Sequence, residues 1–193
     1  MRKLVVAAVA ALAFLAPSSA HAIGFVGARV GYAMPSGDAQ QGAAMKDTIS
    51  SNVPVQIDAG LSMLNILSVG AYGSYGPTQV KSVCTSCTGS ELRAGLQLNL
   101  RPPLVLKSLW GGVFAGWQQQ SLKRSGVFDV KYSGWETGLQ AGWDFSVLPL
   151  IKFGPFASYS VAQFTSASGG GASIAEKANH NQLTVGLRGL FDL

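Results

Sequence analysis

Hydrophobic and polar residues alternate along most of the chain with a period of two. The stretch 91–100 shows this best, because leucine or alanine occupies every even position and a polar residue or glycine every odd one. A period of two is typical of a β-strand with two unlike faces. The pattern recurs eight times, in the segments Phe25–Tyr32, Val53–Met63, Leu67–Tyr75, Glu91–Leu100, Leu109–Trp117, Trp135–Phe145, Ile151–Val161 and Leu183–Leu193.

The connections between these segments alternate in length. Long polar segments follow the first, third, fifth and seventh strands, and shorter ones follow the second, fourth and sixth. An up-and-down barrel with short turns at one end and long loops at the other has this pattern. The strands are about 9–11 residues long, as a tilted strand needs to cross a bilayer. We therefore predict an all-β fold, an eight-stranded antiparallel up-and-down transmembrane β-barrel.

The residue types on the two faces of the strands indicate which face points outward. A soluble barrel with an apolar lumen needs a water-facing set rich in charge, whereas the polar face here consists mainly of glycine and small polar residues. Small residues suit the crowded lumen of a narrow barrel. Aromatic residues of the apolar face gather near strand ends, as in the two interfacial girdles of membrane barrels. The predicted girdles are Tyr32, Tyr75, Trp117, Trp135 and Tyr159 at one level, and Trp143, Phe145, Phe153 and Phe191 at the other.

The composition also favours an apolar surface in contact with lipid. Charged residues make up 12% of the 193 residues, against roughly 25% in average soluble domains. The formal net charge is +5, without runs of basic residues. Such a charge is weak evidence for nucleic-acid binding, so no nucleic-acid partner is expected.

The first 22 residues have the three parts of a secretory signal peptide. A basic pair at positions 2 and 3 precedes the apolar run Leu4–Leu15, and the small residues of Ala20-His21-Ala22 end the segment. The run is too short to span a bilayer as a helix. We predict residues 1–22 to be a cleaved signal peptide and residues 23–193 to be the barrel domain, with an uncleaved anchor as the alternative.

The signal segment, the eight amphipathic strands and the C-terminal sequence Leu187–Leu193 together resemble the small eight-stranded outer-membrane barrels of Gram-negative bacteria, of the OmpA/OmpX-like transmembrane type. The resemblance implies export to the outer membrane, contact with its lipid and lipopolysaccharide, and recognition of the C-terminal strand by the outer-membrane insertion machinery. Members commonly end in an aromatic residue, whereas this chain ends in Leu193 with Phe191 two positions earlier. No periplasmic peptidoglycan-binding domain is expected after the last strand.

Candidate catalytic residues are few. Some barrels that this chain resembles are lipid A deacylases with a His-x-Ser pair and an acidic partner, but the segment here reads His180-Asn181-Gln182. The nucleophile is missing where the pattern requires it, and a serine is not activated without a positioned base. The glycine run 169–171 lacks the Lys-Ser or Lys-Thr that follows in a phosphate loop. We expect a non-enzymatic protein without a cofactor or metal.

Cys84 and Cys87 form the sharpest local motif, Cys84-Thr85-Ser86-Cys87. A zinc site needs four ligands, and there is no second cysteine pair or nearby histidine. A redox motif usually opens a helix in a βαβ unit, which the predicted fold lacks. In an exported chain the motif favours a disulfide that closes the second long loop, with free thiols as the alternative.

Eight charged residues are predicted to point into the lumen: Arg29, Asp58, Arg93, Glu136, Asp144, Lys152, Arg188 and Asp192. Buried charges are costly unless paired, and both signs are present, so we expect ion pairs that fill the lumen. Three of them, Arg29, Asp58 and Arg188, lie mid-strand on strands that are consecutive around the closed barrel, and we expect them to meet. The charges form either a stabilising plug or the gate of a narrow pore.

Three functions follow from these features. The first is a structural or surface-interaction protein whose long extracellular loops contact the outside. The second is a narrow porin-like channel for small solutes. The third is a lipid A-modifying enzyme, which the missing nucleophile disfavours.

Overall fold

The computed structural model describes residues 22–40, 43–44, 49–63, 66–80, 87–102, 108–124, 128–169 and 179–193. In these ranges the regular secondary structure consists of β-strands. Within the same ranges no helix is long and apolar enough to cross a membrane. The predicted signal peptide lies outside the described residues except for Ala22, which begins the first strand.

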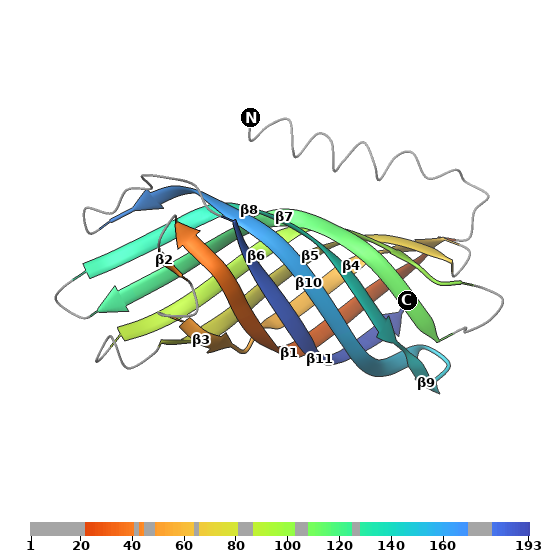
Figure 1. The fold of residues 1–193 in the computed structure, drawn as a ribbon. Coiled ribbons are helices and arrows are strands. Elements are labelled where there is room, and N and C mark those ends of the chain that lie inside the picture. Colours follow the sequence, from red (N-terminus) through yellow and green to blue (C-terminus); the bar gives the residue numbers. More distant parts are fainter. Residues whose placement is uncertain are drawn as a thin grey trace.

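The described residues form eleven strands, eight of which close a ring (Figure 1). Their bounds are β1 Ala22–Gln40, β2 Ala43–Ala44, β3 Ile49–Asn52, β4 Val55–Met63, β5 Leu67–Val80, β6 Cys87–Leu100, β7 Leu109–Arg124, β8 Phe128–Trp143, β9 Phe145–Leu148, β10 Ile151–Ser168 and β11 Asn179–Asp192. The ring runs β1–β4–β5–β6–β7–β8–β10–β11, with antiparallel neighbours, and β11 pairs with both β10 and β1. The predicted eight-stranded antiparallel up-and-down barrel is confirmed.

The three remaining strands are short. β3 pairs with β5 beyond the end of β4, and β2 pairs with β1 in the first connection. β9 pairs with the start of β10 at the opposite, short-turn end. They extend the barrel wall at its two ends without adding a strand to the ring.

Several strands continue further toward the long-loop end than the alternation predicts. β7 runs to Arg124 and pairs with β8 from Phe128, so most of the long polar segment expected between the predicted strands Leu109–Trp117 and Trp135–Phe145 is a hairpin. β10 likewise continues to Ser168. The predicted loop bounds are wrong because both faces of these extensions carry polar residues, so the period-two signal fades while backbone pairing continues.

Two predicted strands are interrupted. The segment Val53–Met63 has no strand at Val53 and Pro54, because proline has no N–H to donate to a ladder. The segment Trp135–Phe145 is broken at the buried Asp144, between β8 and β9. In contrast, Pro155 is exposed within a continuous β10, paired in register with Leu187.

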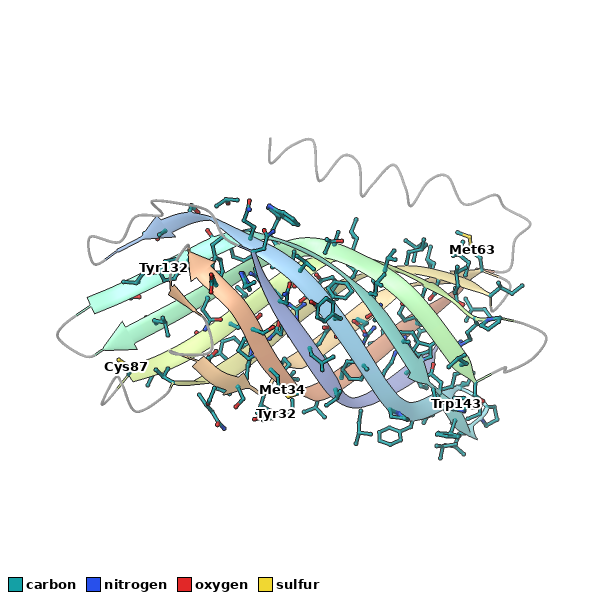
Figure 2. The ribbon with its side chains drawn as sticks, viewed as in Figure 1. Tyr32, Met34, Met63, Cys87, Tyr132 and Trp143 are labelled. Atoms are coloured by element: carbon teal, nitrogen blue, oxygen red, sulfur yellow. The ribbon has the colours of Figure 1, made fainter. Side chains whose placement is uncertain are left out.

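The predicted assignment of the two faces is confirmed. On β6, Leu92 and Leu96 are exposed, whereas Arg93 and Gln97 are buried. Figure 2 shows Tyr32 of β1 on the outside of the wall, where 46% of the side chain is exposed. The outer surface of the barrel is therefore apolar and the lumen side carries the polar groups.

Large aromatic side chains fill the lumen, contrary to the prediction of a lumen lined mainly by glycine and small polar residues. Those buried among the described residues are Phe25, Tyr72, Trp110, Phe114, Phe156 and Phe164. Their rings lie against glycines: a Cβ at Gly116 would be 2.6 Å from the Tyr72 hydroxyl oxygen, and one at Gly142 would be 2.7 Å from Trp110 Cζ2. The inward glycines thus make room for aromatic rings.

Candidate functional site

The middle of the lumen is crossed by the side chain of Arg29. Its Nε donates to Asp58 Oδ2 at 2.6 Å, and its two terminal nitrogens donate to Gln140 Oε1 and Gln97 Oε1, each at 2.7 Å. The second oxygen of Asp58 accepts a hydrogen bond of 2.7 Å from Gln56. Since all three guanidinium nitrogens are engaged, Arg29 joins four strands of the wall, β1, β4, β6 and β8.

A second cluster lies around Glu136, which is buried on β8. Arg93 donates to both carboxylate oxygens of Glu136, and the Tyr72 hydroxyl donates to the same carboxylate at 2.7 Å. The Phe114 ring lies edge-on to Tyr72 with the centroids 5.9 Å apart, and the Arg93 guanidinium carbon is 5.7 Å from its centroid. Charge pairing and aromatic packing therefore occupy the same section of the lumen.

A third cluster lies near the short turns and is centred on Asp144. Its carboxylate accepts hydrogen bonds from Arg101 and from Trp110 Nε1, the latter at 3.1 Å. Arg188 Nη1 lies 3.7 Å from the same carboxylate. Lys152 and Asp192 form a separate ion pair at this end.

The position of Arg188 differs from the prediction that it meets Arg29 and Asp58. Arg29 and Arg188 are opposite each other in the β1–β11 register, and both guanidiniums lie over the Trp110 ring, at 5.4 and 4.3 Å from its centroid. Two like charges so close need separate partners. Arg29 has Asp58, and Arg188 pairs toward the end of the barrel with Asp144.

Two charged residues of these clusters were not among the predicted lumen charges. Glu91 is buried, accepts hydrogen bonds from Asn52 and Gln182, and has one carboxylate oxygen 3.8 Å from Arg93 Nε. The alternation in 91–100 places Glu91 on the lumen side, so the pattern contained this signal. Arg101 follows the last residue of the predicted strand, and the alternation therefore gave no sign of its contact with Asp144.

His180 is buried in the part of the lumen nearer the long loops. Its Nε2 lies 2.5 Å from the side-chain nitrogen of Gln118, and its ring stacks on Phe164 with the centroids 4.4 Å apart. Gln182, at the position where the deacylase pattern has serine, donates to Glu91. The described contacts of His180 thus involve an amide and an aromatic ring. Among the described residues no group of three or more His, Cys, Asp or Glu side chains could hold a metal ion.

The two predicted aromatic girdles differ in extent. The five residues near the long loops are all exposed on the outer wall and come from β1, β5, β7, β8 and β10, with Trp117 and Trp135 directly paired. The other set is Trp143, Phe145, Phe153 and Phe191, on the adjoining strands β8 to β11. Phe145 pairs with Phe153, and its ring stacks on Trp143 at the end of β8, labelled in Figure 2. This second set covers one side of the barrel.

The predicted disulfide involves a residue outside the described ranges. Cys87 begins β6, and Cys84 lies in the undescribed segment before it. We expect the native, unreduced protein to resist a thiol-reactive dye and the reduced protein to react at both cysteines. Because the bond would close only a short loop outside the barrel, reduction should leave the gel shift between boiled and unboiled protein intact. Rapid labelling without reduction would contradict the disulfide.

No protein-family model and no curated protein matches the chain. Among solved structures, the Neisserial surface protein A is 14% identical, with a TM-score of 0.58, and the match covers 86% of this chain and 95% of that one. OprG from Pseudomonas aeruginosa is 16% identical at a TM-score of 0.49, covering 90% and 98%. Ail of Yersinia pestis is 18% identical at a TM-score of 0.45, covering 86% and 98%. The likeness to the Neisserial protein shows a shared fold, which confirms the architecture expected from the resemblance to small outer-membrane barrels.

Proposed function

We propose that this protein is a non-enzymatic outer-membrane β-barrel with a closed lumen, which acts through surface contacts of its extracellular end. The observation that carries the proposal is the hydrogen-bond network across the lumen. Arg29 on β1 reaches Gln97 on β6 and Gln140 on β8, and all three side chains are buried. A solute has to break these bonds to pass, because an eight-stranded barrel is only wide enough for its own side chains.

The apolar outer surface of the barrel supports a location in a membrane. Aliphatic side chains such as Val30, Leu96 and Leu139 are 48%, 48% and 64% exposed on the outer wall. An apolar surface of this kind is stabilised by hydrocarbon, and a closed barrel satisfies its backbone hydrogen bonds without water. With the export signal expected at the N-terminus, the surroundings would be outer-membrane lipid and lipopolysaccharide. The C-terminal strand would then be the segment that the outer-membrane insertion machinery recognises.

The strand extensions provide the surface for contacts outside the cell. Beyond Trp117 and Trp135, the β7–β8 hairpin carries an exposed ion pair between Lys123 and Asp129 and an exposed Lys131. The hydroxyl groups of Ser133 on β8 and Ser166 on β10 share a hydrogen bond. This end is polar where the wall below it is apolar, which fits a surface that faces water and soluble partners.

The channel alternative is tested by single-channel recording in planar bilayers. We expect the wild-type protein to show no steady conductance. Trp110→Ala should produce openings, because it removes a fully buried ring against which the guanidiniums of Arg29 and Arg188 lie. Trp117→Ala, on the outer wall, is the matched control and should stay silent. Steady conductance by the wild-type protein would overturn the closed lumen and favour the porin-like channel.

A further inference from the structure

A cleft opens at the short-turn end of the barrel, between the end of β4, the start of β5 and the end of β6. It is narrow and partly open to solvent, and residues of β4, β5, β6, β7 and β11 contribute to its lining. Its polar groups are the hydroxyls of Ser62 and Ser68, the amide of Asn99, and the guanidiniums of Arg101 and Arg188. Hydrogen-bond donors therefore dominate the polar lining.

The charges around this cleft are not balanced. Arg101 and Arg188 both pair with the single carboxylate of Asp144. Among the described residues neither arginine has an ion pair with another carboxylate. The Arg29–Asp58 pair in the middle of the lumen has one charge of each sign. The cleft thus holds one positive charge in excess, which favours an anion.

Two buried donors of the cleft have no hydrogen-bond partner among the described residues. They are Arg188 Nε and Asn99 Nδ2, and the two residues are only 2% and 4% exposed. The other end of the Asn99 amide is engaged, because its Oδ1 accepts from Gln140 at 2.6 Å. Arg188 is held by its stacking on Trp110. Since an unpaired buried donor is costly, fixed donors of this kind suggest that a ligand completes them.

We propose that this cleft binds a phosphate-type anion, with Arg188, Asn99 and Arg101 as the principal donors. Guanidinium groups and a neutral amide suit the several acceptor oxygens of a phosphate mono- or diester. The apolar residues Ile66 and Leu100 also line the cleft and are exposed on the outer side, 38% and 54%. A phospholipid headgroup could therefore occupy the cleft with its acyl chains along this wall. Free phosphate is the other source of the same chemistry, and only the choice between the two rests on the proposed membrane location.

The test is a calorimetric titration of the full-length, refolded barrel in nonionic micelles. The probes are inorganic phosphate and glycerol phosphate at constant ionic strength, and phosphatidylglycerol added to the micelles. Asn99→Asp replaces the unpaired donor by a negative charge and keeps the oxygen that Gln140 uses. Arg101→Gln removes the excess charge at a residue that is only partly buried. Each change should weaken binding about tenfold or more.

Gln118→Glu is the matched control, because it makes the same amide-to-carboxylate change at a buried lumen position far from the cleft, beside His180. It should leave the affinity unchanged, and the gel shift of unboiled protein checks that every variant is folded. If the wild-type protein binds the two soluble phosphates, and only Asn99→Asp and Arg101→Gln weaken this binding, the ligand is a free anion. Binding of phosphatidylglycerol alone with the same pattern would identify a lipid headgroup. If Asn99→Asp and Arg101→Gln both bind the probes with the affinity of the wild-type protein, the proposed site is wrong. This conclusion does not depend on the result of the conductance experiment.

Discussion

Replacement of Asp58 by alanine is expected to lower the free energy of unfolding by about 3–5 kcal/mol, the usual cost of breaking a buried ion pair. Asp58 is fully buried and accepts from both Arg29 and Gln56. Its loss leaves the Arg29 guanidinium in the lumen without a carboxylate, on the same tryptophan ring as Arg188. The measurement is urea unfolding of the barrel refolded into lipid vesicles.

Asp129→Ala is the matched control for Asp58→Ala. Asp129 also forms an ion pair, with Lys123 at 3.3 Å, but both side chains are about half exposed. Exposed pairs contribute about 0–1 kcal/mol, so this variant should unfold almost as the wild type does. The double variant Arg29→Met/Asp58→Leu should lose less stability than Asp58→Ala alone, because it leaves no unpaired charge. Equal losses in Asp58→Ala and Asp129→Ala would show that the buried pair contributes little.

The sequence was sufficient to predict the ring of strands and the two faces of each. Both follow from the period of two, since residues such as Leu96 and Gln97 must point to opposite sides of the wall. The contact between Arg29 and Asp58 could also be predicted from the sequence, because the two residues lie on neighbouring strands of an up-and-down barrel. In these cases the geometry is local or is set by strands adjacent in sequence.

The filling of the lumen could not be predicted in the same way. Tyr72 lies against Gly95, its register partner on β6, and its hydroxyl group reaches Gly116 on β7, the strand beyond. The alternation places Tyr72 on the lumen side but does not give this direction of its ring across the two neighbouring strands. The pairing of Arg188 with Asp144 depends on the direction in which a long side chain runs along the lumen axis. An alternation pattern assigns a residue to the lumen, but its depth and partner follow from the closed barrel.

The prediction of where the strands end failed for a related reason. The alternation ends where the apolar outer face ends, near Trp117 and Tyr159, whereas β7 and β10 continue to Arg124 and Ser168. Backbone pairing needs no contrast between faces. A pattern of unlike faces therefore marks the part of a strand between two different environments, which in this barrel is the part assigned to the bilayer.

That assignment predicts a second large effect, in the variant Leu96→Arg. Leu96 is half exposed on the outer wall of β6, in register with Ala71 and Ala115. An arginine near the bilayer midplane on the lipid face of a barrel costs about 2–4 kcal/mol. We expect this loss in urea unfolding from lipid vesicles.

Thr88→Arg places the same side chain on the same strand and face, but beyond the level of Leu92, which pairs with Tyr75 of the aromatic girdle. Thr88 is exposed, and its pairing partner on β7 is Lys123. Near or above the interface the cost of an arginine falls to about 0–1 kcal/mol, so Thr88→Arg should leave the unfolding curve nearly unchanged. The difference between the two variants measures depth in the bilayer, since strand, face and introduced charge are the same. If both variants unfold alike, the apolar wall of this barrel does not face hydrocarbon, and the membrane location that the proposed function requires is wrong.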